Sequence, residues 1–551
     1  MLFPCLSGWW QWLTRPASDH AIIRATMHIP RWLRRAFSVP FYPLLGAAYP
    51  VVFLYAQNVH EAVEPYEVFV PLAISLGATV AAFAAFWALT RDWARAALIT
   101  TVLLTLFFTY GMVWDWIGGT LLGHWELVGP WVVLAIVATG VIWRLPSVAR
   151  RVILVLDVAA SLLIIFNLLV IGAFFLNLRL VGAGPTSGVL PGASVGNDVR
   201  KPDVYWIIPE EYGSASVLQD YFSYDNSAFL DALKKRGFYV ADKATANYLK
   251  TAPSLTATRQ MDYLDGVALR EQATSDNDWG PIYRELKAPF TVERYLNALD
   301  YQFIYLGMYW SPTSKHPAAE INYVYDKLTS EFLDVLERAT MLRALEGIGP
   351  QAPYDWRRNR YNQTQYEIQS LDRASGLGGP KLVIAHLALD HAPYVFHADG
   401  SFVAEKDENS RKYEVNYIDQ LKFTNTTLLA WIDKALAVPV AERPIIVLQS
   451  DEGPWTNSYR TNELGFDWLN ATQDELKQKF GILSAFYLPD RTPAQVGLYS
   501  SITPVNTFRA IFHAYFGLDL PLLPDRNYIW PNQGEIYDLV DVTDRLAASP
   551  N

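Results

Sequence analysis

The sequence predicts two parts: an N-terminal α-helical membrane domain of about five spans, then an α/β domain with a mostly parallel central sheet. Long apolar runs fill the first third of the chain, whereas after residue 200 short apolar runs alternate with helical patterns. Charged residues make up 18% of the 551 residues and apolar ones 51%, a balance that favours a chain partly embedded in lipid. A chain of this length is also expected to hold more than one domain.

The membrane domain is expected to comprise residues 1–180. Most of its apolar runs approach the roughly 20 residues that a bilayer-spanning helix needs. The five runs are Phe41–Ala56, Val68–Leu89, Ala96–Trp114, Leu127–Trp143 and Val152–Leu178. Helices buried in a large soluble core are the alternative, but the charged residues between the runs favour membrane spans.

Basic residues are expected on one side of the membrane. Arginines precede the first run and separate the second from the third and the fourth from the fifth, whereas the other two loops contain acidic residues and no Lys or Arg. Because basic loops remain in the cytoplasm, the sequence predicts a multi-pass protein of a bacterial-type inner membrane, with a cytoplasmic N-terminus and an extracytoplasmic C-terminal domain. Asp157, inside the fifth run, is expected to serve helix packing or to lie near the membrane interface, and not to form an ion site.

Residues 181–200, rich in Gly, Pro and Ser, are expected to link the membrane domain to an extracytoplasmic domain of residues 201–551. The chain has one cysteine, Cys5, so this domain must be stabilised by its core and not by disulfides. Residues 1–200 hold 12 Lys and Arg against 9 Asp and Glu, a net charge of +3. Because the whole chain has a net charge of −10, the remaining residues carry about −13. An acidic domain argues against nucleic acid as a partner.

The α/β domain is predicted from strand-like apolar runs that alternate with helical patterns. The strand-like runs are Val204–Ile208, Phe238–Val240, Phe303–Leu306, Leu382–Leu387 and Ile445–Gln449, and the helical ones include Ser227–Arg236, Val292–Ala298 and Tyr413–Leu436. Between Ser311 and Gly379 the pattern becomes helical and aromatic, and we expect an insertion over the sheet edge there, with plain helical packing as the role of most of its aromatic rings.

Two of the predicted strands end in paired carboxylates. The last strand precedes Asp451 and Glu452, and the first precedes Glu210 and Glu211. Ligands bind beyond the carboxyl ends of parallel strands, so these two ends side by side would form an oxygen-rich pocket of the kind that hard divalent cations prefer. A turn in which Asp451 caps a backbone amide is the alternative.

A third element is the segment Thr251-Ala252-Pro253-Ser254, in which the proline suits the first turn of a helix. This predicts that Thr251 is the N-cap, with its hydroxyl beside the positive end of the helix. A plain capping role is one reading. Beside a divalent ion, the same hydroxyl would be a nucleophile that faces a site for an anionic group.

In their order along the chain, these segments resemble the sulfatase and phosphotransferase branch of the alkaline phosphatase superfamily. The segments are the strand before Glu210, Asn226–Tyr239, the Thr251 segment and the strand before Asp451. Five spans before an outward domain further resemble membrane-anchored lipoteichoic acid synthases. The resemblance covers residues 201–530 and implies an alkaline-phosphatase-like domain with one metal ion held by Glu210, Thr251 and Asp451.

The resemblance also assigns roles in catalysis. Thr251 matches the nucleophile, and His391, in Asp390-His391-Ala392-Pro393, resembles a histidine that contacts the substrate head group. A structural role is the alternative for His391. Sulfatases of this branch carry a Cys or Ser that is oxidised to formylglycine where this chain has threonine, so the resemblance implies phosphoryl transfer and not sulfate-ester hydrolysis.

A second departure concerns the metal site. Members of the family usually carry Asp-His-Gly where this chain has Asp451-Glu452-Gly453. Glu452 as a ligand would add negative charge around the metal and repel an anionic substrate. Lys250 and Arg259 would offset that charge if they face inward.

The sequence therefore predicts a membrane-anchored, metal-dependent phosphotransferase or phosphodiesterase that acts on lipid head groups or envelope polymers. The expected cofactor is one divalent ion, with Mn²⁺, Mg²⁺ or Ca²⁺ preferred over Zn²⁺. A catalytically silent relative that binds an envelope glycan or lipid is the alternative, and a transporter has little support without internal repeats. The expected site residues are Thr251 and His391 for catalysis, Glu210, Thr251, Asp451 and Glu452 for the metal, and Lys250, Arg259, His391 and Trp455 for the substrate.

Overall fold

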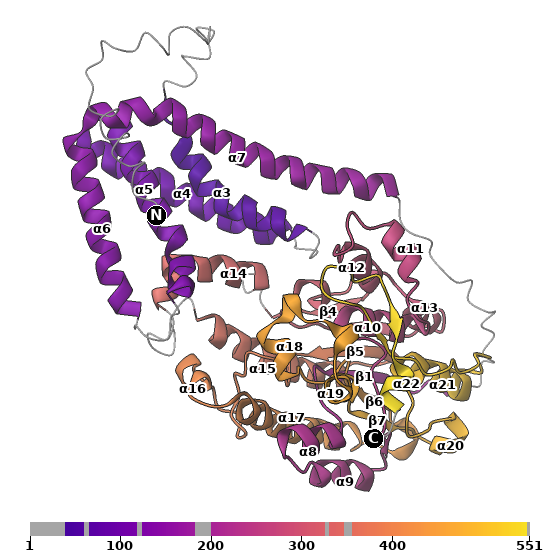
Figure 1. Ribbon diagram of the computed structural model, residues 1–551. Coiled ribbons are helices and arrows are strands. Elements are labelled where there is room, and N and C mark those ends of the chain that lie inside the picture. Colours follow the sequence, from indigo (N-terminus) through magenta and orange to yellow (C-terminus); the bar gives the residue numbers. More distant parts are fainter. Residues whose placement is uncertain are drawn as a thin grey trace. The chain divides into compact units, whose positions relative to one another are not determined.

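The computed structural model describes residues 39–59, 65–117, 124–181, 200–325, 330–345 and 355–547 (Figure 1). Cys5, the N-terminal arginines and nearly all of the predicted linker lie outside these residues.

Five helices form the first described part of the chain. They are α3 (Tyr42–Gln57), α4 (Pro65–Thr90), α5 (Trp93–Trp116), α6 (His124–Arg144) and α7 (Pro146–Val181). Among the described residues, the four helices α4 to α7 are long and apolar enough to cross a membrane. Helix α3 has 16 residues, and at 1.5 Å per residue it reaches about 24 Å, less than the hydrocarbon core of about 30 Å. All five predicted runs are helical, and the number of spans is four to five.

Asp157 of α7 has a structural role. Its Oδ1 accepts hydrogen bonds from the backbone amides of Tyr42, at 2.7 Å, and Phe41, at 3.1 Å. Amides at the start of a helix have no carbonyl partner within that helix, so the carboxylate satisfies two donors at the start of α3. This contact ties α7 to α3 and confirms the helix-packing role expected for Asp157.

The α/β domain is built on a seven-stranded sheet in the order β2-β7-β6-β1-β5-β3-β4. The strands are β1 (Val204–Pro209), β2 (Tyr239–Val240), β3 (Gln302–Leu306), β4 (Ile321–Tyr323), β5 (Lys381–Leu387), β6 (Ile445–Gln449) and β7 (Ser484–Tyr487). Strand β7 pairs antiparallel with β6 and β2, whereas all the pairs from β6 through β1, β5 and β3 to β4 are parallel. The predicted, mostly parallel sheet is confirmed. A separate ribbon pairs β8 (Tyr528–Ile529) with β9 (Val540–Asp541).

Helices cover both faces of this sheet (Figure 1). The described helices of this part of the chain are α8 (Ala215–Phe222), α9 (Ser227–Lys235), α10 (Thr251–Gln260), α11 (Gly266–Glu271), α12 (Gly280–Lys287), α13 (Thr291–Asn297), α14 (Glu331–Ala339), α15 (Trp356–Ser375), α16 (Glu405–Asn409), α17 (Tyr413–Ala435), α18 (Asn457–Thr461), α19 (Gln473–Phe480), α20 (Pro493–Val496), α21 (Pro504–Phe516) and α22 (Thr543–Ala547). Alternate side chains of β1 enter two different cores, as the two-residue period of a strand requires. Trp206 packs in the core that includes α10, α12, α13 and α21, and Tyr205 in the core that includes α8, α9, α15 and α17. Every residue of β1 is therefore buried, as the apolar run predicts.

The region between residues 311 and 379 differs from the expected insertion. It supplies β4 at the sheet edge, and its long helix α15 packs against β3 and β5. Leu371 and Ala374 of α15 are buried in one of the two central cores. The prediction of a cover over the sheet edge is wrong for α15, because an aromatic-rich pattern does not distinguish a helix on a face of the sheet from one at its edge.

Candidate active site

Polar side chains from separate segments line one cavity of the α/β domain. Glu210 follows β1, Glu452 follows β6, His391 follows β5, Tyr309 follows β3, and Thr251 begins α10. The strands β6, β1, β5 and β3 are neighbours and run parallel, so their carboxyl ends lie at the same edge of the sheet. This edge is where open α/β sheets bind ligands.

Three buried side chains next to this cavity form a cluster suited to a metal ion. One ligand atom each from Glu210, His386 and Asp451 lies within 4.8 Å of the others. The strand register explains the cluster: His386 of β5 is level with Ile208 of β1, and side chains two residues apart share a face, so Glu210 points the same way. Ile207 is level with Leu448 of β6, and continuing three residues along each strand brings Glu210 level with Asp451.

The cluster contains buried polar atoms that have no hydrogen-bond partner. They are Oε2 of Glu210, Oδ2 of Asp451 and both ring nitrogens of His386. Burial and the neighbouring carboxylates raise the pKa of Glu210 well above its usual value, while burial lowers the pKa of His386 to about 4 and so keeps its imidazole neutral. Such groups are costly to bury without a partner, and they fit a divalent cation as two oxygen ligands and one nitrogen ligand.

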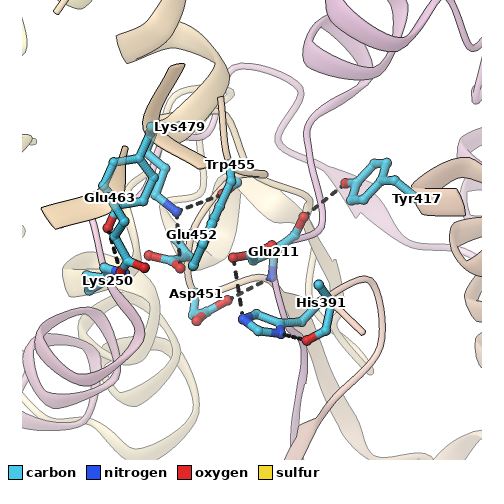
Figure 2. A network of polar contacts seen from close by, with 12 residues as sticks. Glu211, Lys250, His391, Tyr417, Asp451, Glu452, Trp455, Glu463 and Lys479 are labelled. Atoms are coloured by element: carbon cyan, nitrogen blue, oxygen red, sulfur yellow. Dashed lines mark hydrogen bonds and ion pairs between the residues drawn. The ribbon is translucent and has the colours of Figure 1, made fainter. Parts of the chain in front are cut away.

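The turn after β1 is fixed by hydrogen bonds to the same region. The backbone amide of Glu211 donates to Oδ1 of Asp451 at 3.2 Å, and its carbonyl accepts from the hydroxyl of Tyr417 at 2.9 Å (Figure 2). Glu211 has a φ of 57°, a backbone conformation that is strained for a residue other than glycine. These bonds hold the strained turn and so fix Glu210 relative to Asp451.

Thr251 lines the cavity, but it is not the N-cap of its helix. Lys250 occupies the cap position with extended backbone angles, and Thr251 is the first residue of α10. The prediction that Thr251 caps the helix is therefore wrong by one residue. Its side chain is 7% exposed and belongs to the first turn, where the helix dipole is positive.

Glu452 is paired with a lysine that the sequence analysis did not identify. Nζ of Lys479, in α19, lies 3.1 Å from Oε1 of Glu452 and donates to the carbonyl of Gly453 at 3.2 Å (Figure 2). Lys479 is fully buried, so its positive charge offsets the negative charge that Glu452 was expected to add around the metal. Oε2 of Glu452 has no hydrogen-bond partner. The geometry thus supports Glu452 as the partner of Lys479, with His386 as the third donor of the metal cluster.

Lys250 and Trp455 both line the cavity. Nζ of Lys250 lies 2.8 Å from Oε1 of Glu463 and 4.7 Å from the ring centroid of Trp455 (Figure 2). The ammonium group is therefore held in place by a carboxylate and an aromatic face, next in sequence to Thr251.

Arg259 lies elsewhere. Its guanidinium pairs with Glu293 at 2.6 Å and contacts Nε2 of His316 at 2.6 Å, and the side chain is 2% exposed. It is not among the residues that line the cavity. Its contacts join α10 to α13 inside the core and do not present it to a substrate.

His391 faces the cavity between two polar groups. Its Nε2 lies 3.8 Å from Oε1 of Glu211, and its Nδ1 contacts the backbone carbonyl of Ala392 (Figure 2). Nδ1 also lies 3.3 Å from the hydroxyl of Tyr309. Burial lowers the pKa of His391 to about 4, so the ring is neutral at physiological pH. Because the Ala392 carbonyl can only accept, Nδ1 carries the hydrogen of the neutral ring, and Nε2 can accept a hydrogen bond from a substrate.

The buried pair of Glu452 and Lys479 can be tested by a double-mutant cycle. Lys479→Met is expected to lower the free energy of unfolding by about 3–5 kcal/mol, because Glu452 stays buried without its cation. Glu452→Gln added to Lys479→Met should recover much of that loss. Losses that simply add, measured by denaturant unfolding of the full-length protein, would show that the two side chains do not depend on each other.

The carboxylates also predict how pH acts on the metal-free protein. Burial raises the pKa of Glu452 from 4.5 to about 7, with Lys479 opposing and Asp451 adding to the rise. Between these two values the folded state holds a proton that the unfolded state has released, so stability is expected to fall as pH rises from about 5 to 7. Thermal melting should show this fall without metal and a smaller one with a divalent ion. A melting temperature that rises over this range without metal would contradict the arrangement.

No known protein-family model and no curated protein sequence matches this chain. Solved structures are similar to it. The C-terminal periplasmic domain of EptC from Escherichia coli shares 13% identity over 64% of this chain and 96% of that domain, with a TM-score of 0.39. The integral membrane protein lipooligosaccharide phosphoethanolamine transferase A from Neisseria meningitidis shares 13% identity over 86% of this chain and 95% of that one, with a TM-score of 0.37. A putative sulfatase from Bacteroides fragilis shares 12% identity over 62% of this chain and 83% of that one, with a TM-score of 0.35.

Proposed function

We propose that this chain is a membrane-anchored, metal-dependent phosphotransferase or phosphodiesterase that uses Thr251 as its nucleophile. The observation that carries this proposal is that Thr251, Glu210 and His391 line one cavity, next to the buried cluster of Glu210, His386 and Asp451. A hydroxyl, a cation site and a neutral imidazole are the parts that nucleophilic phosphoryl transfer requires.

The metal ion would be held by Glu210, His386 and Asp451, with Thr251 close by. A divalent ion there supplies positive charge that favours ionisation of the threonine hydroxyl and offsets the charge of a phosphoryl group. One imidazole with two carboxylates suits Zn²⁺ as well as Mn²⁺. Zn²⁺ therefore joins the ions expected from an oxygen-only site.

The chain's own residues then account for the reaction. The Oγ of Thr251 forms a bond to phosphorus as the bond from phosphorus to the leaving alcohol breaks; the hydroxyl proton is released, and the leaving oxygen takes up a proton. The oxygen of an acceptor hydroxyl or water next bonds to phosphorus as the bond from phosphorus to the Thr251 oxygen breaks; the acceptor releases its proton, and the Thr251 oxygen takes one up. Lys250 places a positive charge beside the cavity, where it can attract the anionic group.

The substrates we propose are lipid head groups or envelope polymers. Helices long enough to span a bilayer precede the α/β domain in the chain, which keeps the domain at a membrane. In this proposal the N-terminus is cytoplasmic and the α/β domain lies outside the inner membrane. Trp455 and Lys250 both line the cavity and contact each other. The Trp455 ring suits an apolar group of a ligand, and the Lys250 ammonium suits an anionic one.

A test uses the full-length protein in detergent with bis(p-nitrophenyl) phosphate and Mn²⁺ or Zn²⁺. We expect metal-dependent release of nitrophenolate and a covalent adduct on the peptide that contains Thr251. p-Nitrophenyl sulfate, as a matched ester, should not be turned over, because threonine cannot become formylglycine. A protein that binds metal but neither turns over the diester nor carries an adduct would support instead a silent relative that binds an envelope glycan or lipid.

A further inference from the structure

The loop after β3 brings a tyrosine to the cavity that has no role in the reaction described so far. Strand β3 lies beside β5, the strand that precedes His391, and Tyr309 is the third residue after β3 ends. A Cβ at Gly307 would collide with the carbonyl oxygens of Thr313 and Ser314. Glycine at 307 thus lets the chain fold back closely, which brings Tyr309 into the cavity wall.

The Tyr309 ring is fixed from behind by a charged pair. The guanidinium carbon of Arg360, in α15, lies 3.5 Å from the ring centroid, and Arg360 pairs with Asp334 of α14 at 2.6 Å. Both charged side chains are about 6% exposed. A cation stacked on an aromatic face and anchored by a buried carboxylate restricts how the ring can move.

The hydroxyl of Tyr309 reaches the reactive side of the cavity. It lies 3.3 Å from Nδ1 of His391. Burial and the nearby Glu210 raise the pKa of Tyr309 well above its usual value, although Arg360 acts in the opposite direction. The hydroxyl therefore keeps its proton at physiological pH. Nδ1 of His391 also contacts the Ala392 carbonyl, which can only accept, so Nδ1 carries a hydrogen and the Tyr309 proton is available for donation.

A neutral donor suits this cavity for an electrostatic reason. Four buried carboxylates, Glu210, Glu211, Asp451 and Glu452, follow β1 and β6, and the charges of the other three act on Glu210, a proposed metal ligand. The phosphoryl group that must enter is also anionic, so its oxygens need donors that bring no further negative charge. Donors fixed before the reaction contribute most where charge develops in the transition state.

On the basis of the proposed function, we propose that Tyr309 is a catalytic residue whose hydroxyl donates a hydrogen bond to the phosphoryl group during its transfer. In this arrangement Arg360 is a positioning residue that holds the ring, and His391 orients the hydroxyl. No covalent bond to Tyr309 forms, and its proton stays on the phenol oxygen.

Tyr309→Phe tests this directly, because it removes the hydroxyl and keeps the ring on Arg360. With the full-length protein, bis(p-nitrophenyl) phosphate and Mn²⁺, we expect kcat to fall by about 100-fold while KM stays near that of the wild type. Inhibition by orthovanadate, which mimics the transition state, should weaken by a similar factor. The matched control is Tyr295→Phe, which removes a buried hydroxyl that donates to the Phe516 carbonyl at 3.1 Å and should leave kcat unchanged.

Two results would overturn the inference. A Tyr309→Phe variant with the kcat of the wild type, or one in which only KM rises, would show that the hydroxyl does not act in the transition state. Thr251→Ala in the same assay separates this inference from the proposed function. If the wild type turns over the diester, Thr251→Ala does not, and Tyr309→Phe does so normally, the inference alone fails; if the wild type is inactive, the proposed function fails.

Discussion

Replacement of Thr251 by Ala is expected to abolish turnover of a phosphodiester while the protein stays folded. Loss of a nucleophile removes the covalent route, and we expect kcat to fall on the order of 10⁴-fold or more. The cost in stability should be small, within about 0.5 kcal/mol, because the helix cap is Lys250 and Ala favours helical positions. Nitrophenolate release and thermal melting of the full-length protein measure the two effects.

Two matched variants make this prediction specific. Thr251→Ser keeps a hydroxyl and should retain measurable activity. Thr258→Ala removes a hydroxyl from the same helix, one that donates to the Ser254 carbonyl at 2.7 Å, and should keep the kcat of the wild type. Full activity in Thr251→Ala would disprove the nucleophile assignment and leave Ser254 or water as the attacking group.

Asp451→Asn is expected to remove metal binding and activity together. The amide keeps the shape of the side chain and an oxygen that can accept from the Glu211 amide, but it removes one of two carboxylate ligands. Loss of a ligand should weaken metal affinity by more than about 100-fold. Removing a residue that only hydrogen-bonds to a metal ligand already weakens affinity by about 10- to 100-fold, and Asp451 is itself expected to be a ligand. At a metal concentration of 100 Kd, the wild type gains about 2.7 kcal/mol of stability, and the variant should gain almost none.

Asp419→Asn is the control for this change. Asp419 pairs with Arg411 at 2.8 Å and does not line the cavity. It should bind metal like the wild type by calorimetry and thermal shift. Equal metal affinity in Asp451→Asn would place the ion somewhere other than between β1 and β6.

The meeting of the acidic residues that follow two strands could be predicted from the sequence, because parallel strands have their carboxyl ends at the same edge of the sheet. Short apolar runs at Val204–Ile208 and Ile445–Gln449 are typical of buried parallel strands, and β1 and β6 are neighbours. The acidic residues that follow such strands lie at one edge of the sheet, so Glu210 and Asp451 meet. Their convergence needs no knowledge of the helices.

His386 and Lys479 could not be predicted in the same way. His386 lies inside a strand, and only the pairing of His386 with Ile208 shows that it faces the site. Its one sequence signal is that it is the only ionisable residue in the run Leu382–Leu387. Lys479 lies in a polar helix, α19, and only the packing of that helix buries its ammonium beside Glu452.

Arg259 and Tyr309 show that distance from Thr251 along the sequence does not predict which residues share its cavity. Arg259 is eight residues further along α10, so it lies about 12 Å along the helix axis, among α13 and the core. Tyr309 follows a strand that the sequence analysis identified, but the strand ends in apolar and aromatic residues and not in carboxylates. A polar or ionisable side chain shortly after a buried parallel strand is the sequence signal that would have identified Tyr309.

Anomalous diffraction from crystals of the full-length protein soaked in Mn²⁺ would locate the metal ion. We expect one strong peak coordinated by Glu210, His386 and Asp451, with the Thr251 hydroxyl beside it. An ordered ion held by Glu452 away from Thr251, or no ion at these side chains in a metal-saturated protein, would contradict this expectation.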